Sequence, residues 1–78
     1  MDWKLKIVCD PNVLMGKPTV RGTRLAVGFL LDLLAQGWSH DQIRDNYPQL
    51  TKEDISAVLS YSAARIKDEE TVPLKFGT

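Results

Sequence analysis

The sequence predicts a small, mainly α-helical domain in which three helices follow a short N-terminal β-hairpin. Apolar residues recur with helical spacing in three successive segments after residue 25, whereas the segment before them shows short alternating patterns divided by Gly and Pro. The chain has 78 residues and one Cys, so its stability must come from packing or self-association and not from an intrachain disulfide. We expect one domain over residues 1–67 and a tail over residues 68–78.

Residues 4–25 are predicted to form strands and the hairpin. In residues 4–9 the residues Leu5, Ile7 and Cys9 alternate with Lys6 and Val8, and a turn signal that contains Pro follows, so this segment is predicted to be a strand. Further along, residues 19–20 and residues 23–25 flank the dipeptide Arg21-Gly22, which favours a tight hairpin turn. An isolated pair of strands is marginal in water, so this unit must pack on the helices or on another copy of itself.

The first two helices are predicted from their end signals. The first covers residues 26–36, where apolar residues recur at spacings of three and four, and Gly37 stops it in the left-handed position that suits glycine. The second covers residues 39–47, because Ser39 and Gln42 match a capping box and a proline follows the segment.

The third helix is predicted over residues 51–66. Thr51 is placed to cap its N-terminus, and Asp54 occupies its third position. Its expected core side consists of Ile55, Val58, Leu59 and Ile66, supported by Ala57, Tyr61, Ala63 and Ala64.

Three helices with short connections, the middle one short, favour a helix-turn-helix (homeodomain-like) bundle. In that arrangement the third helix is the candidate recognition helix for DNA, and Lys52, Ser56 and Ser60 would contact the groove. Glu53 opposes this hypothesis because a carboxylate repels phosphate, and a hydrated helix face is the alternative. The formal net charge is zero, which also weakens a role that depends on neutralising phosphates.

Candidate partner-binding residues lie near the N-terminus. The basic residues Lys17, Arg21 and Arg24 gather on the predicted hairpin, where they are suited to contact phosphate or an acidic protein surface. A turn that charge keeps soluble is the alternative. Trp3 precedes the first strand, where we expect few intrachain neighbours, and strand pairing across a homodimer would cover it.

The remaining residues offer no chemistry for catalysis, a metal or a cofactor. One His and one Cys fall short of a zinc ligand set, and Asp41 and Asp45 lack a third ligand nearby. We expect Cys9 to be a small core side chain in the first strand. Because these groups are missing, we expect a non-enzymatic protein. The charged first ten residues are unlike a secretory signal, so we expect the protein to be cytoplasmic. The longest apolar run, residues 25–31, is too short to span a bilayer, so we expect no membrane partner.

The order of short motifs resembles a family of small bacterial proteins called domain of unknown function 433. The motifs are Gly-Lys-Pro at residues 16–18, Arg-Gly-Thr-Arg at residues 21–24 and Tyr-Pro-Gln-Leu-Thr at residues 47–51, within a match from residue 7 to residue 63. The resemblance implies a helix-turn-helix domain behind a small hairpin. It also implies likeness to VapB-type antitoxins, which are often encoded beside a PIN-like ribonuclease toxin.

These observations lead to two functional hypotheses. The first is an antitoxin-like homodimer that neutralises a PIN-like toxin and also binds operator DNA, with Arg21 or Arg24 pairing with the toxin's carboxylates. The acidic tail, residues 68–78, is the less suitable alternative for an acidic cleft. The second hypothesis is an autonomous dimeric regulator that binds DNA. A purely structural adaptor, for which the basic hairpin is unused, is a third possibility.

Overall fold

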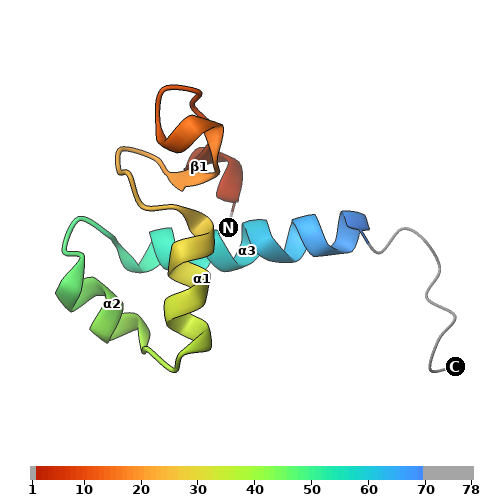
Figure 1. The fold of residues 1–78 in the computed structure, drawn as a ribbon. Helices are drawn as coiled ribbons and strands as arrows, with labels where there is room; N and C mark the ends of the chain where they lie inside the picture. The colour runs from red at the N-terminus through yellow and green to blue at the C-terminus, as the bar shows by residue number, and fades with distance from the viewer. Residues whose placement is uncertain (1, 70–78) are drawn as a thin grey trace, which may run out of the picture.

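The computed structural model describes residues 2–69 of the chain. It is mainly helical with a small antiparallel sheet, as the sequence predicts (Figure 1). Within this range, no helix is long and apolar enough to cross a membrane. In chain order the elements are the 3₁₀ turn η1 (Trp3–Leu5), strand β1 (Ile7–Val8), the 3₁₀ turn η2 (Leu14–Gly16), strand β2 (Thr19–Val20) and the helices α1 (Val27–Ala35), α2 (His40–Asn46) and α3 (Lys52–Glu69).

Apart from the C-terminus of α3, each helix end lies within one residue of its predicted position. Gly37, with a φ of 94°, follows the last turn of α1, and its N–H donates to the carbonyl of Leu34 at 3.0 Å. The capping box of α2 is complete: Ser39 Oγ accepts from the Gln42 N–H at 3.1 Å, and Gln42 Oε1 accepts from the Ser39 N–H at 2.7 Å. These bonds satisfy donors that the first turn of a helix leaves without partners.

The start of α3 repeats this arrangement with a carboxylate. Thr51 Oγ1 accepts from the Asp54 N–H at 3.1 Å, and Asp54 Oδ2 accepts from the Thr51 N–H at 2.9 Å. Asp54 is only 7% exposed and also lies 3.6 Å from Lys6 Nζ. The cap of α3 therefore also connects the helix to the N-terminal segment.

The predicted strand over residues 4–9 is wrong in extent. Trp3–Leu5 form η1, in which Asp2 Oδ1 accepts from the Lys4 N–H at 3.0 Å and the Lys6 N–H donates to the Trp3 carbonyl at 2.9 Å. The Asp2 cap offers the backbone an alternative to strand pairing, which the alternation of side chains does not reveal. Only Ile7 and Val8 pair as a strand.

The predicted hairpin of residues 19–20 with residues 23–25 forms only in part: the Val20 N–H donates to the Leu25 carbonyl at 3.1 Å, but residues 23–25 form no strand. Strand β2 pairs with β1, with Ile7 opposite Val20 and Val8 opposite Thr19. The chain after the turn returns to β2 through one isolated bridge, between Thr19 and Ala26. Pairing with β1 places Ile7 and Val20 side by side in the core, a gain that a tight local hairpin does not offer.

Helix α3 continues three residues beyond its predicted end, to Glu69. The first two residues of the predicted tail, residues 68–69, are therefore helical, and residues 70–78 lie outside the described residues. Residues 67–69 are all charged, so apolar periodicity carries no signal there. In Figure 1 the C-terminal half of α3 projects away from the other helices.

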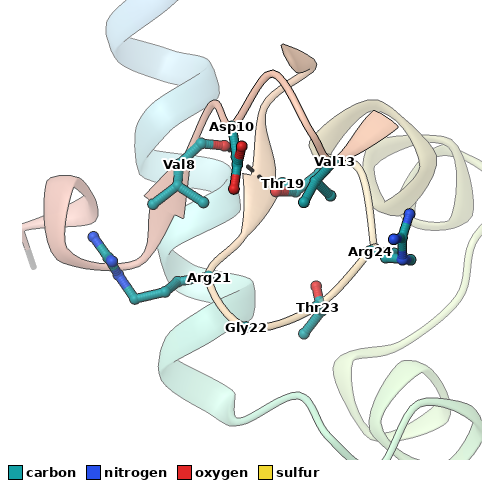
Figure 2. Close-up of a pocket in the computed structure, with 8 residues that line it drawn as sticks. All are labelled: Val8, Asp10, Val13, Thr19, Arg21, Gly22, Thr23 and Arg24. Atoms are coloured by element: carbon teal, nitrogen blue, oxygen red, sulfur yellow. Dashed lines mark hydrogen bonds between the residues drawn. The ribbon is translucent and has the colours of Figure 1, made fainter. Parts of the chain in front are cut away.

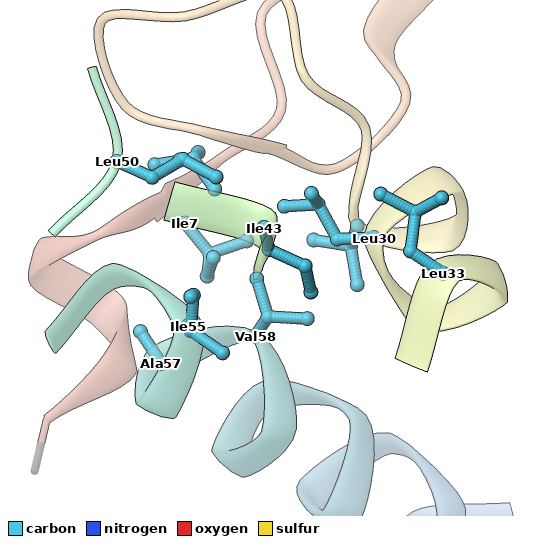
Figure 3. Close-up of a cluster of buried hydrophobic side chains, with 10 residues drawn as sticks. Ile7, Leu30, Leu33, Ile43, Leu50, Ile55, Ala57 and Val58 are labelled. Atoms are coloured by element: carbon cyan, nitrogen blue, oxygen red, sulfur yellow. The ribbon is translucent and has the colours of Figure 1, made fainter. Parts of the chain in front are cut away.

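The hydrophobic core lies where the three helices meet the small sheet (Figure 3). Ile43 of α2 and Val58 of α3 are fully buried, and Leu30 of α1 is nearly so. Two predicted core residues of α3 are not buried: Leu59 is 41% exposed and Ile66 is 53% exposed. Ala57, which is predicted to support this side, is fully buried. Complete burial of the larger members is worth about 1.5–3 kcal/mol for each side chain.

Trp3 differs from the prediction because it has an intrachain neighbour. Its ring meets the ring of Tyr61 edge to face, with centroids 4.9 Å apart, and the side chain is half-buried against the core. Such a pair is worth about 0.5–1.5 kcal/mol beyond the buried area. Together with the pair between Lys6 and Asp54, this contact fixes the N-terminal segment on α3.

Candidate functional site

The turn after β2 is held by its own hydrogen bonds. The Val20 carbonyl accepts from the Thr23 N–H at 3.0 Å, and Gly22 has a φ of 81°, a left-handed conformation that glycine adopts without strain. The Thr23 hydroxyl donates to the Val20 carbonyl at 2.8 Å and accepts from the Leu25 N–H at 3.0 Å. The two arginines beside this turn, Arg21 and Arg24, therefore leave the backbone from fixed positions.

We define Lys17, Arg21 and Arg24 as the basic turn surface. All three side chains are exposed, and none forms an ion pair with a side chain among residues 2–68. Arg21 Nε donates to the Leu5 carbonyl at 3.0 Å, which anchors the stem and leaves the two amino groups of the guanidinium for another acceptor. The two amino groups can donate hydrogen bonds to a carboxylate or a phosphate of a partner.

A shallow hollow of about 470 Å³ lies beside the turn (Figure 2). Val8 and Thr19 line it from the sheet, and Asp10, Arg21 and Arg24 line it from the loops. In Figure 2 the two arginines leave the loop on opposite sides and do not converge on one point. This divergence suits an extended acidic surface better than a single small anion.

An exposed apolar loop precedes the basic turn surface. Leu14 and Met15 have positive φ values of 48° and 59°, and Met15 is 92% exposed. Non-glycine residues in this conformation are strained by about 1–3 kcal/mol each, and such strain is common at binding sites. Sequence reasoning missed Met15, because Gly16 and Pro18 indicate a turn without showing which neighbouring residue adopts the left-handed conformation.

The predicted DNA-contacting residues lie on α3, away from the basic turn surface in sequence. Lys52 and Glu53 are exposed at the start of the helix, whereas Ser56 and Ser60 are half-buried. A half-buried serine has less freedom to reach a base edge than the exposed position that the prediction assumed.

The described residues offer no cluster of carboxylate, Cys and His side chains that could hold a metal ion. Asp41 forms an ion pair with Arg44 of the same helix. Cys9 is exposed, so its predicted place in the core is wrong: the strand that would have buried it ends at Val8.

Comparison with known proteins identifies two similarities. The profile of a family described as "Protein of unknown function (DUF433)" matches residues 7–62. The fold is similar to the crystal structure of a DUF433 member protein from Anabaena variabilis, with a TM-score of 0.74, 33% sequence identity and coverage of 81% of this chain. This chain spans 62% of the length of that protein. Among the curated proteins, none matches the chain.

Proposed function

The chain belongs to the DUF433 family, and we propose that it is a non-enzymatic binding protein of the antitoxin type, which neutralises a PIN-like ribonuclease by covering its acidic cleft. The observation that supports this proposal is the basic turn surface. Its three cations are exposed, and none has an ionic partner among the side chains of residues 2–68. Between residues 7 and 26, Asp10 is the only acidic residue, so this part of the molecule has a positive excess. An acidic cleft would provide the missing counter-charges.

The two arginines supply directional contacts for such a cleft. A guanidinium binds a carboxylate through two parallel hydrogen bonds, and Arg21 already has its stem fixed by the Leu5 carbonyl. Because Arg21 and Arg24 point to opposite sides, each would pair with a different carboxylate of the partner. The exposed Met15 would add an adaptable apolar contact beside these charges.

Co-purification with the product of the adjacent reading frame tests this proposal. We expect a stable complex, and we expect the double variant Arg21→Glu/Arg24→Glu to bind at least about tenfold more weakly, because each change places like charges in contact. The matched control is Lys52→Glu, which reverses the charge of an exposed cation at the start of α3, outside the basic turn surface. Recovery of the two proteins as separate species, or equal binding by the double variant and the control, would contradict the proposal.

A DNA-binding regulator with a helix-turn-helix arrangement is the second candidate function. The observation that favours it is the succession of the short helix α2, a connection of five residues and α3, with Lys52 exposed at the start of α3. Binding of this kind weakens steeply as salt rises, because counterions are released from the phosphates.

Fluorescence anisotropy with a labelled duplex from the upstream region separates the two functions. A DNA-binding regulator gives a salt-dependent increase, and Lys52→Glu reduces it on all sequences. The absence of binding at low salt would remove this candidate and leave the first one unchanged.

A further inference from the structure

A second surface lies between the start of α1 and the projecting half of α3. There a groove of about 320 Å³, here called the α1–α3 groove, has mostly apolar walls. Ile66 is 53% exposed on its α3 wall. The other residues that carry the argument are Val27, Gly28 and Leu31 of α1 and Tyr61 and Arg65 of α3.

The groove and the exposed side chain beside it are complementary. Ile66 is a partly exposed apolar side chain on one wall of the groove. The opposite wall has free space at Gly28, where an added Cβ would meet no atom within 4 Å. A two-fold symmetric contact requires a single surface that carries both the projecting side chain and the space that receives it. We propose that the α1–α3 groove is a self-association surface, in which Ile66 of each copy packs against Gly28 and Leu31 of the other.

The charges on the chain and beside the groove favour a second copy as the occupant. The chain has a formal net charge of zero, so two copies approach without net repulsion. Arg65 lines the groove, and Asp68 is exposed less than one turn further along α3. When two α3 helices run antiparallel about an axis near Ile66, Arg65 of one copy lies opposite Asp68 of the other, and the symmetry makes this pair twice.

The surface is separate from the partner site proposed above. None of the three cations of the basic turn surface lines the α1–α3 groove. Self-association can therefore be measured on the purified chain alone, without a toxin or DNA.

Sedimentation equilibrium of the full chain from about 5 µM to about 500 µM tests the proposal. We expect the apparent mass to rise with concentration from 8.8 kDa towards twice that value. Ile66→Asp should raise the dissociation constant at least about a hundredfold, because each dimer loses the burial of two isoleucines. The matched control Leu5→Asp, which places the same charge on another exposed apolar residue, should behave as the unchanged chain.

Gly28→Trp is a second variant, which fills the groove from its α1 wall. It should also keep the chain at the mass of one copy, and circular dichroism should show the helical content of the unchanged chain. A constant mass of 8.8 kDa for the unchanged chain at all concentrations would overturn the proposal, as would docking of the chain's own residues 70–78 in the groove. Equal self-association of the unchanged chain and Ile66→Asp would assign the contact to another face and would also overturn it.

Discussion

The cap at the start of α3 supports a quantitative prediction about stability. Asp54 is 7% exposed, and its carboxylate accepts from the Thr51 N–H at 2.9 Å and lies 3.6 Å from Lys6 Nζ. Asp54→Ala removes this acceptor and leaves both groups without their partner. The Asp54 N–H keeps its own bond to Thr51 Oγ1, so the variant tests the carboxylate alone.

The two contacts of the carboxylate differ in expected size. A hydrogen bond to a charged group contributes about 1.5–3 kcal/mol to the free energy of unfolding. The Lys6 side chain is 37% exposed, so solvent screens the ion pair and limits it to about 1 kcal/mol or less. Asp54→Ala should therefore lower the free energy of unfolding by about 2–3 kcal/mol, and Lys6→Gln by less than about 1 kcal/mol. For a domain of this size the larger loss corresponds to a fall in Tm of roughly 10–20 °C.

Urea unfolding followed by far-ultraviolet circular dichroism measures these differences. Asp41→Ala is the matched control, because Asp41 also lies in the first turn of a helix and pairs with a basic residue, Arg44, but is exposed; we expect a change below about 0.5 kcal/mol. The reasoning is refuted if Asp54→Ala falls within about 0.5 kcal/mol of the unchanged chain, or if Lys6→Gln costs as much as Asp54→Ala.

Three further predictions concern single positions. Gly22→Ala should destabilise the fold by about 1 kcal/mol, because Gly22 has a φ of 81°. Gly28→Ala should stabilise α1 by up to about 1 kcal/mol, because its added Cβ has free space. Equal effects of the two variants on the free energy of unfolding in urea would contradict the assignment of these two conformations. Ile43→Ala should cost about 2–5 kcal/mol, since Ile43 is fully buried, and a thermal scan with an unchanged Tm would show that this side chain is not part of the core. Cys9 should react with a thiol reagent in the folded protein at nearly the rate seen in urea, and strong protection would show that it is buried.

The sequence predicts the helix ends well because the forces that set them are local. The cap of α2 depends on Ser39 and Gln42, and the cap of α3 on Thr51 and Asp54, each pair only three residues apart. Gly37 ends α1 through its own backbone conformation. No knowledge of the rest of the chain is needed for any of these assignments.

The N-terminal segment is predicted less well because distant residues decide its structure. Trp3 packs on Tyr61, and Lys6 pairs with Asp54, both in a helix that begins more than forty residues later. Alternation of side chains identifies the phase of a strand, but it does not identify which segment will pair with it. For this reason the sequence indicates a β-hairpin but assigns its second strand to residues 23–25 in place of the pairing with β1.

Exposure of apolar residues is the second feature that periodicity cannot predict. Leu59 and Ile66 keep the spacing of a core stripe, yet they are 41% and 53% exposed. Leu59 follows the fully buried Val58, so its exposure reflects the face of α3 on which it lies and not its distance along the helix. Met15 is exposed for a different reason, because the strained backbone of η2 holds it away from the domain. Candidate binding residues of this kind become visible only when the tertiary arrangement is known.

The basic turn surface and the α1–α3 groove are connected through two adjacent residues. Pro18 lines the groove, and Thr19 lines the hollow beside Arg21 and Arg24. The Pro18 carbonyl accepts from the Val27 N–H at 2.9 Å, so the segment that separates the two surfaces is fixed to the start of α1. A dimer formed through the groove would therefore hold two basic turn surfaces at a fixed separation. Two linked binding surfaces raise the effective affinity for a partner with two acidic sites without any new contact, so self-association and partner binding would reinforce each other through geometry alone.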